Sequence, residues 1–217
     1  MKRMKCLLAA VVLPGVLFFS ACTANVDVRV LADGSTAVSY DALFGDAFIE
    51  VMKSLSEAGS GSLFDTKTIA EQFRTAGIPN VKVSSKADTS LAVSALLPAG
   101  SKDPVSASGC LSADANSLTL SLSPGQLSAL YKTLPESVKS YIDLFMAPVF
   151  SGESMSVQDY TGLVASVYGK PLSDEVAAAK VRITLYGPAG SGKSSSVTVP
   201  LTDILTAVKP LVYTVTW

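Results

Sequence analysis

The 217-residue chain contains no histidine, and this absence removes the commonest catalytic base and the commonest protein ligand for metals. Ser-His-Asp and Cys-His catalytic arrangements are therefore impossible. Charged side chains make up only 16% of the residues, where about 25% is usual. The net charge is −1, from 17 basic and 18 acidic side chains. This balance excludes a generally basic surface of the kind that binds nucleic acid.

Sequence motifs for enzymes and metals are also missing. The chain has neither an S-x-x-K nor a G-x-S-x-G nucleophile motif, and no spacing typical of a calcium loop. Two carboxylate pairs, Asp46 with Glu50 and Asp174 with Glu175, could serve acid–base chemistry, but each is typical of the exposed face of a helix. We therefore predict a non-enzymatic protein with no catalytic residues, no cofactor and no metal site.

The first 21 residues have the three-part layout of a secretory signal. Lys2, Arg3 and Lys5 give a basic start, residues 6–19 are apolar apart from one Pro-Gly pair, and two small residues follow. An apolar run of this length is shorter than the roughly 20 residues that a membrane-spanning helix needs. A cleaved signal is thus favoured over a permanent membrane helix.

The residues at the end of this signal, Phe19-Ser20-Ala21-Cys22, resemble the lipobox of bacterial lipoproteins in the relaxed form known from spirochaetes. The resemblance implies that the signal peptide 1–21 is cleaved and that Cys22 carries lipid, palmitate included. More than one acyl chain is needed for stable attachment, and a triacylated cysteine would supply them. The next residue is Thr23 and not Asp, which by resemblance to the sorting rule of diderm bacteria favours the outer membrane. The resemblance implies a cell-envelope location, periplasmic or at the surface, and no particular activity.

Cysteine usage in the cleaved chain excludes an internal disulfide. Cys6 would be removed with the signal and Cys22 would carry the lipid, which leaves Cys110 alone. Two interpretations of Cys110 stay open: a buried small hydrophobic residue, or an exposed thiol available for pairing with another molecule.

Hydrophobic periodicity predicts an α+β fold with a mostly antiparallel sheet covered by several amphipathic helices. Residues 22–217 are expected to form a single domain, and two subdomains split near 98–116 are the alternative. Strands are expected over 26–30, 36–40, 80–85, 90–97, 117–122, 180–186, 195–200 and 211–217, with a short one near Val105 in an otherwise irregular segment 98–116. Helices are expected over 43–55, 65–76, 127–134, 138–146, 156–168 and 172–179, with a helical turn over 202–207. Asp65 is the expected cap of the second helix, Ser154 or Ser156 that of the fifth, and Pro148 is expected to stop the fourth.

One motif suggests nucleotide binding. Residues 187–194, Gly-Pro-Ala-Gly-Ser-Gly-Lys-Ser, match the P-loop pattern at every fixed position. A P-loop must open a helix that points at the phosphates, yet the residues after Ser194 have the character of a strand. Only 23 residues follow Ser194, too few for the usual downstream strands. We therefore interpret residues 187–194 as a hairpin loop and predict no nucleotide binding.

Aromatic and methionine side chains on the expected helices allow two interpretations. They can form an ordinary core, or they can line a hydrophobic cavity between helices and sheet. The residues concerned are Phe44, Phe48, Met52, Phe64, Phe73, Tyr131, Tyr141, Phe145, Met146, Phe150, Met155, Tyr160 and Tyr168. The sequence thus predicts a lipoprotein anchored through Cys22 that binds a lipid or other apolar ligand near the membrane. The alternative is a protein-interaction or envelope-assembly lipoprotein.

Overall fold

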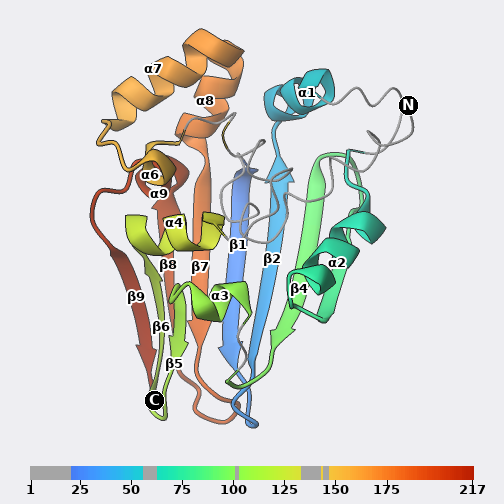
Figure 1. Ribbon diagram of the computed structural model, residues 1–217, viewed down its shortest axis with the longest axis vertical. Helices are drawn as coiled ribbons and strands as arrows, with labels where there is room; N and C mark the ends of the chain where they lie inside the picture. Colours follow the sequence, from blue (N-terminus) through green and yellow to red (C-terminus); the bar gives the residue numbers. More distant parts are fainter. Residues whose placement is uncertain (1–20, 56–62, 101–102, 133–142, 144–146) are drawn as a thin grey trace.

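A computed structural model describes residues 21–55, 63–100, 103–132, 143 and 147–217 (Figure 1). The strands are β1 (Ala21–Val30), β2 (Thr36–Phe44), β3 (Asn80–Ser84), β4 (Ser90–Leu97), β5 (Leu111–Ala113), β6 (Ser117–Leu122), β7 (Lys180–Tyr186), β8 (Ser194–Pro200) and β9 (Leu211–Thr216). The helices are α1 (Asp46–Leu55), α2 (Thr66–Thr75), α3 (Pro104–Ala107), α4 (Pro124–Lys132), α6 (Pro148–Ser151), α7 (Val157–Tyr168), α8 (Lys170–Ala178) and α9 (Leu201–Leu205).

The strands form a six-stranded sheet in the order β3-β4-β2-β1-β7-β8 and a three-stranded sheet in the order β5-β6-β9. All pairs are antiparallel except β1 with β7, where Val26 registers with Ile183. The predicted α+β fold with a mostly antiparallel sheet is confirmed. The parallel pair places the first strand, β1, beside β7, whereas the last strand, β9, belongs to the three-stranded sheet.

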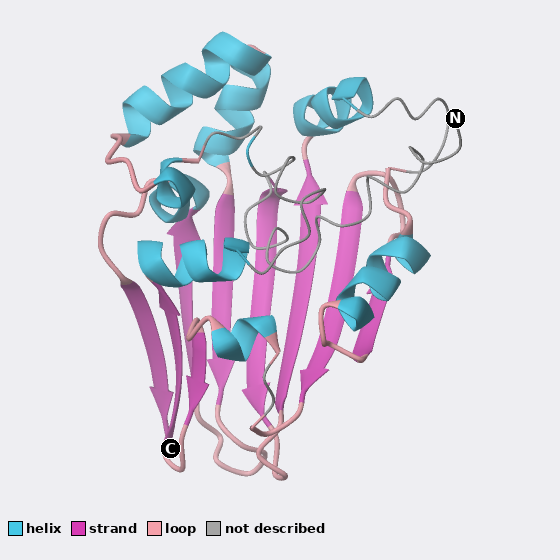
Figure 2. Ribbon diagram, in the orientation of Figure 1, coloured by secondary structure: helices cyan, strands magenta, loops and turns pink. Residues whose placement is uncertain are grey.

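The helices cover one face of the six-stranded sheet (Figure 2). Strand β1 turns Ala24, Val26 and Val28 toward them, because side chains alternate between the two faces of a strand. These residues join one hydrophobic core with buried residues of α2, α4 and α8 and with the leucines of β6. Cys110 belongs to the buried residues, with a side chain 2% exposed, which agrees with its interpretation as a small hydrophobic residue.

Several element boundaries differ from those expected. Leu43 and Phe44 belong to β2 and not to the following helix, since Phe44 N–H donates to Thr89 O at 2.8 Å. Val105 lies in helix α3 and not in a strand. Asp103 caps that helix by accepting from Val105 N and Ser106 N, and Pro104 occupies its first turn.

The helix expected over 138–146 lies outside the described residues, apart from Asp143. Pro148, expected to stop that helix, begins α6 instead, where a missing N–H is harmless. The expected caps at Asp65 and Ser156 are both present at the starts of α2 and α7.

Candidate functional site: the open face of the sheet

The second face of the six-stranded sheet is not packed against the described helices, and we call it the open face. It carries the side chains that alternate with the core residues, and nearly all of them are polar or small. Two neighbouring rows cross the strands in register: Lys82–Ser94–Ser39–Asp27–Thr184–Ser196 and Asn80–Leu96–Ala37–Arg29–Tyr186–Ser194. The first row is polar throughout, as is common on the solvent-facing side of an antiparallel sheet.

A groove of about 630 Å³ is hollowed into the open face over these two rows. Its floor lies on the central strands and consists of the small side chains of Ala37 and Ser39 on β2 and Ser94 on β4, with Leu96 of β4 beside them. Longer side chains rise on both sides, Lys82 on β3 and Arg29 with Tyr186 on β1 and β7. Small residues between long ones explain why a flat sheet presents a hollow here.

The β1 side of the groove is held in place by a cation–π contact. The guanidinium carbon of Arg29 lies 4.2 Å from the centroid of the Tyr186 ring. Such contacts contribute about 0.5–1 kcal/mol at exposed sites and leave the guanidinium N–H groups free to donate. Arg29 is therefore oriented without an acidic partner in contact with it.

The open face is positively charged in a chain that is otherwise acidic. It carries Arg29, Lys82, Lys180 and Arg182 against Asp27 and Asp41. The remainder of residues 22–217 has ten basic and sixteen acidic side chains. None of the three charged groove residues, Lys82, Arg29 and Asp27, forms an ion pair with another described residue. The groove can thus receive an anion from outside, and its serine hydroxyls and Asp27 can hydrogen-bond to a polar ligand.

In the described part of the chain, no group of three or more His, Cys, Asp or Glu side chains is arranged to hold a metal ion. Nor do the described residues contain a helix long and apolar enough to cross a membrane.

Cys22, the predicted lipidation site, lies in the backbone of β1. The next residue, Thr23, pairs with Leu43 of β2 and Lys180 of β7. Ala21 already pairs with Phe44 and the register shifts between Ala21 and Thr23, so Cys22 lies within the strand at an irregularity, with no linker between it and the sheet. Residues 1–20, including most of the predicted signal and lipobox, lie outside the described residues.

Residues 187–194 connect the antiparallel strands β7 and β8, which pair from Tyr186 with Ser194 onward. Gly187 N–H donates to Lys193 O at 3.0 Å and closes the turn. A strand follows Ser194 where a P-loop would have a helix, so no helix N-terminus points at this loop.

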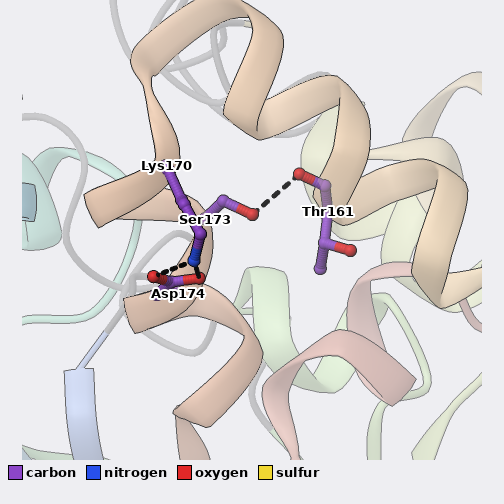
Figure 3. A network of polar contacts seen from close by, with 4 residues as sticks. All are labelled: Thr161, Lys170, Ser173 and Asp174. Carbon is purple, nitrogen blue, oxygen red and sulfur yellow. Dashed lines mark hydrogen bonds and ion pairs between the residues drawn. The ribbon is translucent and has the colours of Figure 1, made fainter.

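The two expected carboxylate pairs differ in the structure: Asp46 and Glu50 stay together on α1, whereas Asp174 and Glu175 have different partners. Asp46, Glu50 and Asp174 are exposed as predicted, and Asp174 is paired with Lys170 one helical turn earlier at 2.6 Å (Figure 3). Ser173, beside this pair, donates from its hydroxyl to Thr161 O at 2.8 Å and ties α8 to α7 (Figure 3).

Glu175 corrects the expectation of an exposed helix face. Its carboxylate accepts from Ala47 N–H at 2.8 Å and Phe48 N–H at 3.0 Å, so it caps α1 from a different helix. A carboxylate engaged in this way is structural and not poised for acid–base chemistry.

Several of the aromatic side chains singled out in the sequence build core. Phe44 of β2 stacks on Phe48 of α1 with 5.0 Å between ring centroids, and the Phe64 ring is tilted against Phe44 at 5.1 Å. A smaller hollow of about 300 Å³ lies beside α4, α6 and α7, and Tyr131, Phe150, Met155 and Leu163 contribute to its lining. Tyr141, Phe145 and Met146 lie outside the described residues.

No protein-family model matches the chain, and a search of curated proteins found no match. The groove residues Asp27, Arg29, Lys82 and Tyr186 were not singled out by the sequence. In the sequence they occupy the positions that alternate with the apolar residues of each strand. Only the order of the strands in the sheet shows that these positions share one surface.

Proposed function

We propose that this protein is a lipid-anchored binding protein of the bacterial cell envelope, without catalytic activity, that holds a macromolecular partner on the open face of its sheet. The observation that carries the proposal is the groove, a hollow with unpaired charges on the uncovered face. Tyrosine and arginine are the residues most enriched at energetic centres of protein interfaces, and here Arg29 and Tyr186 are already in contact. Among the functions expected from the sequence, a protein-interaction role fits this surface better than storage of an apolar ligand.

The position of Cys22 supports anchoring close to the membrane. A lipid on Cys22 would be attached to the first residue of β1 in the cleaved chain, at the end of the sheet where α1, α7 and α8 gather (Figure 1). That end of the sheet would then rest against the bilayer. The open face would stand beside the membrane, where a neighbouring protein can approach it from the side.

The anchoring half of the proposal is tested by metabolic labelling with a radioactive fatty acid. The wild-type chain should incorporate the label, whereas Cys22→Ala should lose it and accumulate as a longer precursor. Cys110→Ala is the matched control and should be labelled normally. Persistent labelling of the Cys22→Ala variant would refute lipidation at this residue.

The binding half is tested by photo-crosslinking in intact cells. A photoreactive amino acid at Ser94, on the groove floor, should give a discrete adduct that Lys82→Glu abolishes. The same amino acid at Ser166 on exposed α7 should not give this adduct. An adduct that forms equally at Ser166 or survives Lys82→Glu would contradict binding at the open face.

An apolar ligand remains a second candidate because of the hollow beside α4, α6 and α7. Its aromatic and methionine lining has the adaptable character that such a ligand favours. Native mass spectra of the protein before and after organic extraction test it. Extra mass that extraction removes, and that Leu163→Arg prevents from binding, would support this function. A clean mass with no uptake from a lipid extract would reject it.

A further inference from the structure

We infer that the groove on the open face recognises an extended acidic peptide segment of a partner protein, with two carboxylates spaced four residues apart. This inference deepens the proposed function and rests on it for the biological setting alone. It is argued from the charge, the spacing and the shape of the groove.

The charges select an anionic occupant. Lys82 and Arg29 stand on opposite sides of the groove, and neither is neutralised by an ion pair with a described residue. Asp27 lies two residues before Arg29 on the same face of β1, so it reduces the positive charge on that side, whereas Lys82 is three strands away from it and stays fully positive. An ammonium on one wall and a guanidinium on the other suit two separate carboxylates better than a single one.

The spacing selects the pattern of the two carboxylates. Strands β3 and β1 are separated by β4 and β2, and Arg29 lies two residues further along β1 than the partner position of Lys82, so their backbones are about 16 Å apart at a strand spacing of about 4.8 Å and a rise of about 3.3 Å per residue. An extended peptide rises about 3.3 Å per residue, so positions i and i+4 are about 13 Å apart. These two positions also point to the same side of an extended chain, whereas i and i+3 point to opposite sides. The long side chains on the walls and on the peptide close the small remaining difference.

The floor of the groove suits the residue between the two acids. Ser39 and Ser94 are small and present hydroxyls, whereas Ala37 and Leu96 present apolar side chains. A peptide residue at i+2 would face these side chains, and a small residue fits there. Asp27 weakens the hold on the carboxylate at Arg29 and would repel any further carboxylate, which limits the acidic positions to two.

The test uses the full-length protein in detergent and two labelled peptides of identical composition, acetyl-Gly-Glu-Ser-Ser-Ser-Glu-Gly-amide and acetyl-Gly-Glu-Ser-Ser-Glu-Ser-Gly-amide. Fluorescence anisotropy at low salt should show at least fivefold tighter binding of the first, which carries the i, i+4 pair. Lys82→Glu and Arg29→Glu should each weaken its binding about tenfold, and Asp27→Asn should strengthen it. If charge reversal disturbs folding, Lys82→Gln, which removes the charge without reversing it, replaces Lys82→Glu.

Lys209→Glu makes the same charge change in the exposed loop before β9 and serves as the matched control. Its effect should stay below twofold. Equal affinity for both peptides, no binding of either, or an equal loss in the control would overturn the inference. Binding of oligogalacturonate in place of the peptides, lost in Lys82→Glu, would assign the groove to an anionic glycan and overturn it too. Because this assay needs neither the anchor nor the native partner, its failure alongside a groove-specific crosslink in cells would leave the proposed function standing.

Discussion

The carboxylate of Glu175 connects two helices that are far apart in the sequence, α8 and α1. Glu175 of α8 accepts from the first free N–H groups of α1, which a helix cannot satisfy internally. Gly45 makes this approach possible, because a Cβ at this position would overlap the Glu175 carboxylate. Residues 45 and 175 are thus one unit, formed by a contact that no local pattern reveals.

Glu175→Ala should lower the free energy of unfolding by about 1–2 kcal/mol, because two N–H groups at the start of α1 lose their acceptor. Asp174→Ala is the neighbouring control, and it should cost less than about 0.5 kcal/mol since its ion pair is exposed. Urea denaturation measures both. Gly45→Ala and Glu175→Ala should be less than additive in the double variant, and strict additivity would contradict the shared unit.

The buried hydroxyl of Tyr40 is a second feature at the residue scale that bears on stability. Its hydroxyl is buried and has no hydrogen-bond partner among the described residues. A buried polar group without a partner is costly, so Tyr40→Phe should leave the free energy of unfolding unchanged or raise it by about 1 kcal/mol. Tyr131→Phe, which removes a hydrogen bond to Asp143 of 2.7 Å, should not stabilise the protein. A loss above 1 kcal/mol in Tyr40→Phe would mean that the hydroxyl has a bound partner, such as an enclosed water.

At the scale of elements, the sequence predicted the type of most strands and helices and missed the features set by distant contacts. Clean alternation identified 117–122 and 180–186, and caps identified the starts of α2 and α7. Leu43 and Phe44 were misplaced because their apolar character continues the stripe of α1, while hydrogen bonding to the β4 side of the sheet keeps them extended. The groove was missed for the same reason. Its residues come from five strands, and the order of these strands is decided by pairing across most of the chain.

Residues 187–194 have the sequence pattern of a P-loop but the geometry of a hairpin loop, and substitutions can test which of the two describes their function. Lys193 is exposed, so Lys193→Ala should change the free energy of unfolding by less than about 0.5 kcal/mol. Gly192→Ala should cost about 1 kcal/mol, because Gly192 has φ +62°. Thermal unfolding with and without ATP and magnesium should show no shift in Tm for the wild type. An ATP-dependent rise in Tm that Lys193→Ala abolishes would refute the hairpin interpretation.

At the scale of the whole molecule, the two faces of the six-stranded sheet differ in character, since one packs into the core and the other carries charged side chains. The covered face holds all the strands together through one hydrophobic core, in which tyrosines are buried beside aliphatic side chains. The open face has little to bury and is free to carry charge. Substitutions on the open face should therefore change binding with little effect on stability, whereas changes in the core should do the reverse.

Alkaline pH tests the core as a whole. Burial raises the pKa of both Tyr40 and Tyr160 above the ordinary tyrosine value near 10. Below pH 10 both tyrosines are neutral in the folded and unfolded states, so their contribution to stability is fully present. Above pH 10 the unfolded chain loses these protons first, and the free energy of unfolding should fall by up to about 1.4 kcal/mol per pH unit for each tyrosine.

Urea denaturation at pH 9, 10 and 11 and constant ionic strength measures this slope. The double variant Tyr40→Phe with Tyr160→Phe should flatten it, whereas Phe48→Leu should lower stability at every pH and keep the slope. An unchanged slope in the double variant would show that these hydroxyls reach solvent before the protein unfolds, and would place them outside the tightly packed part of the core.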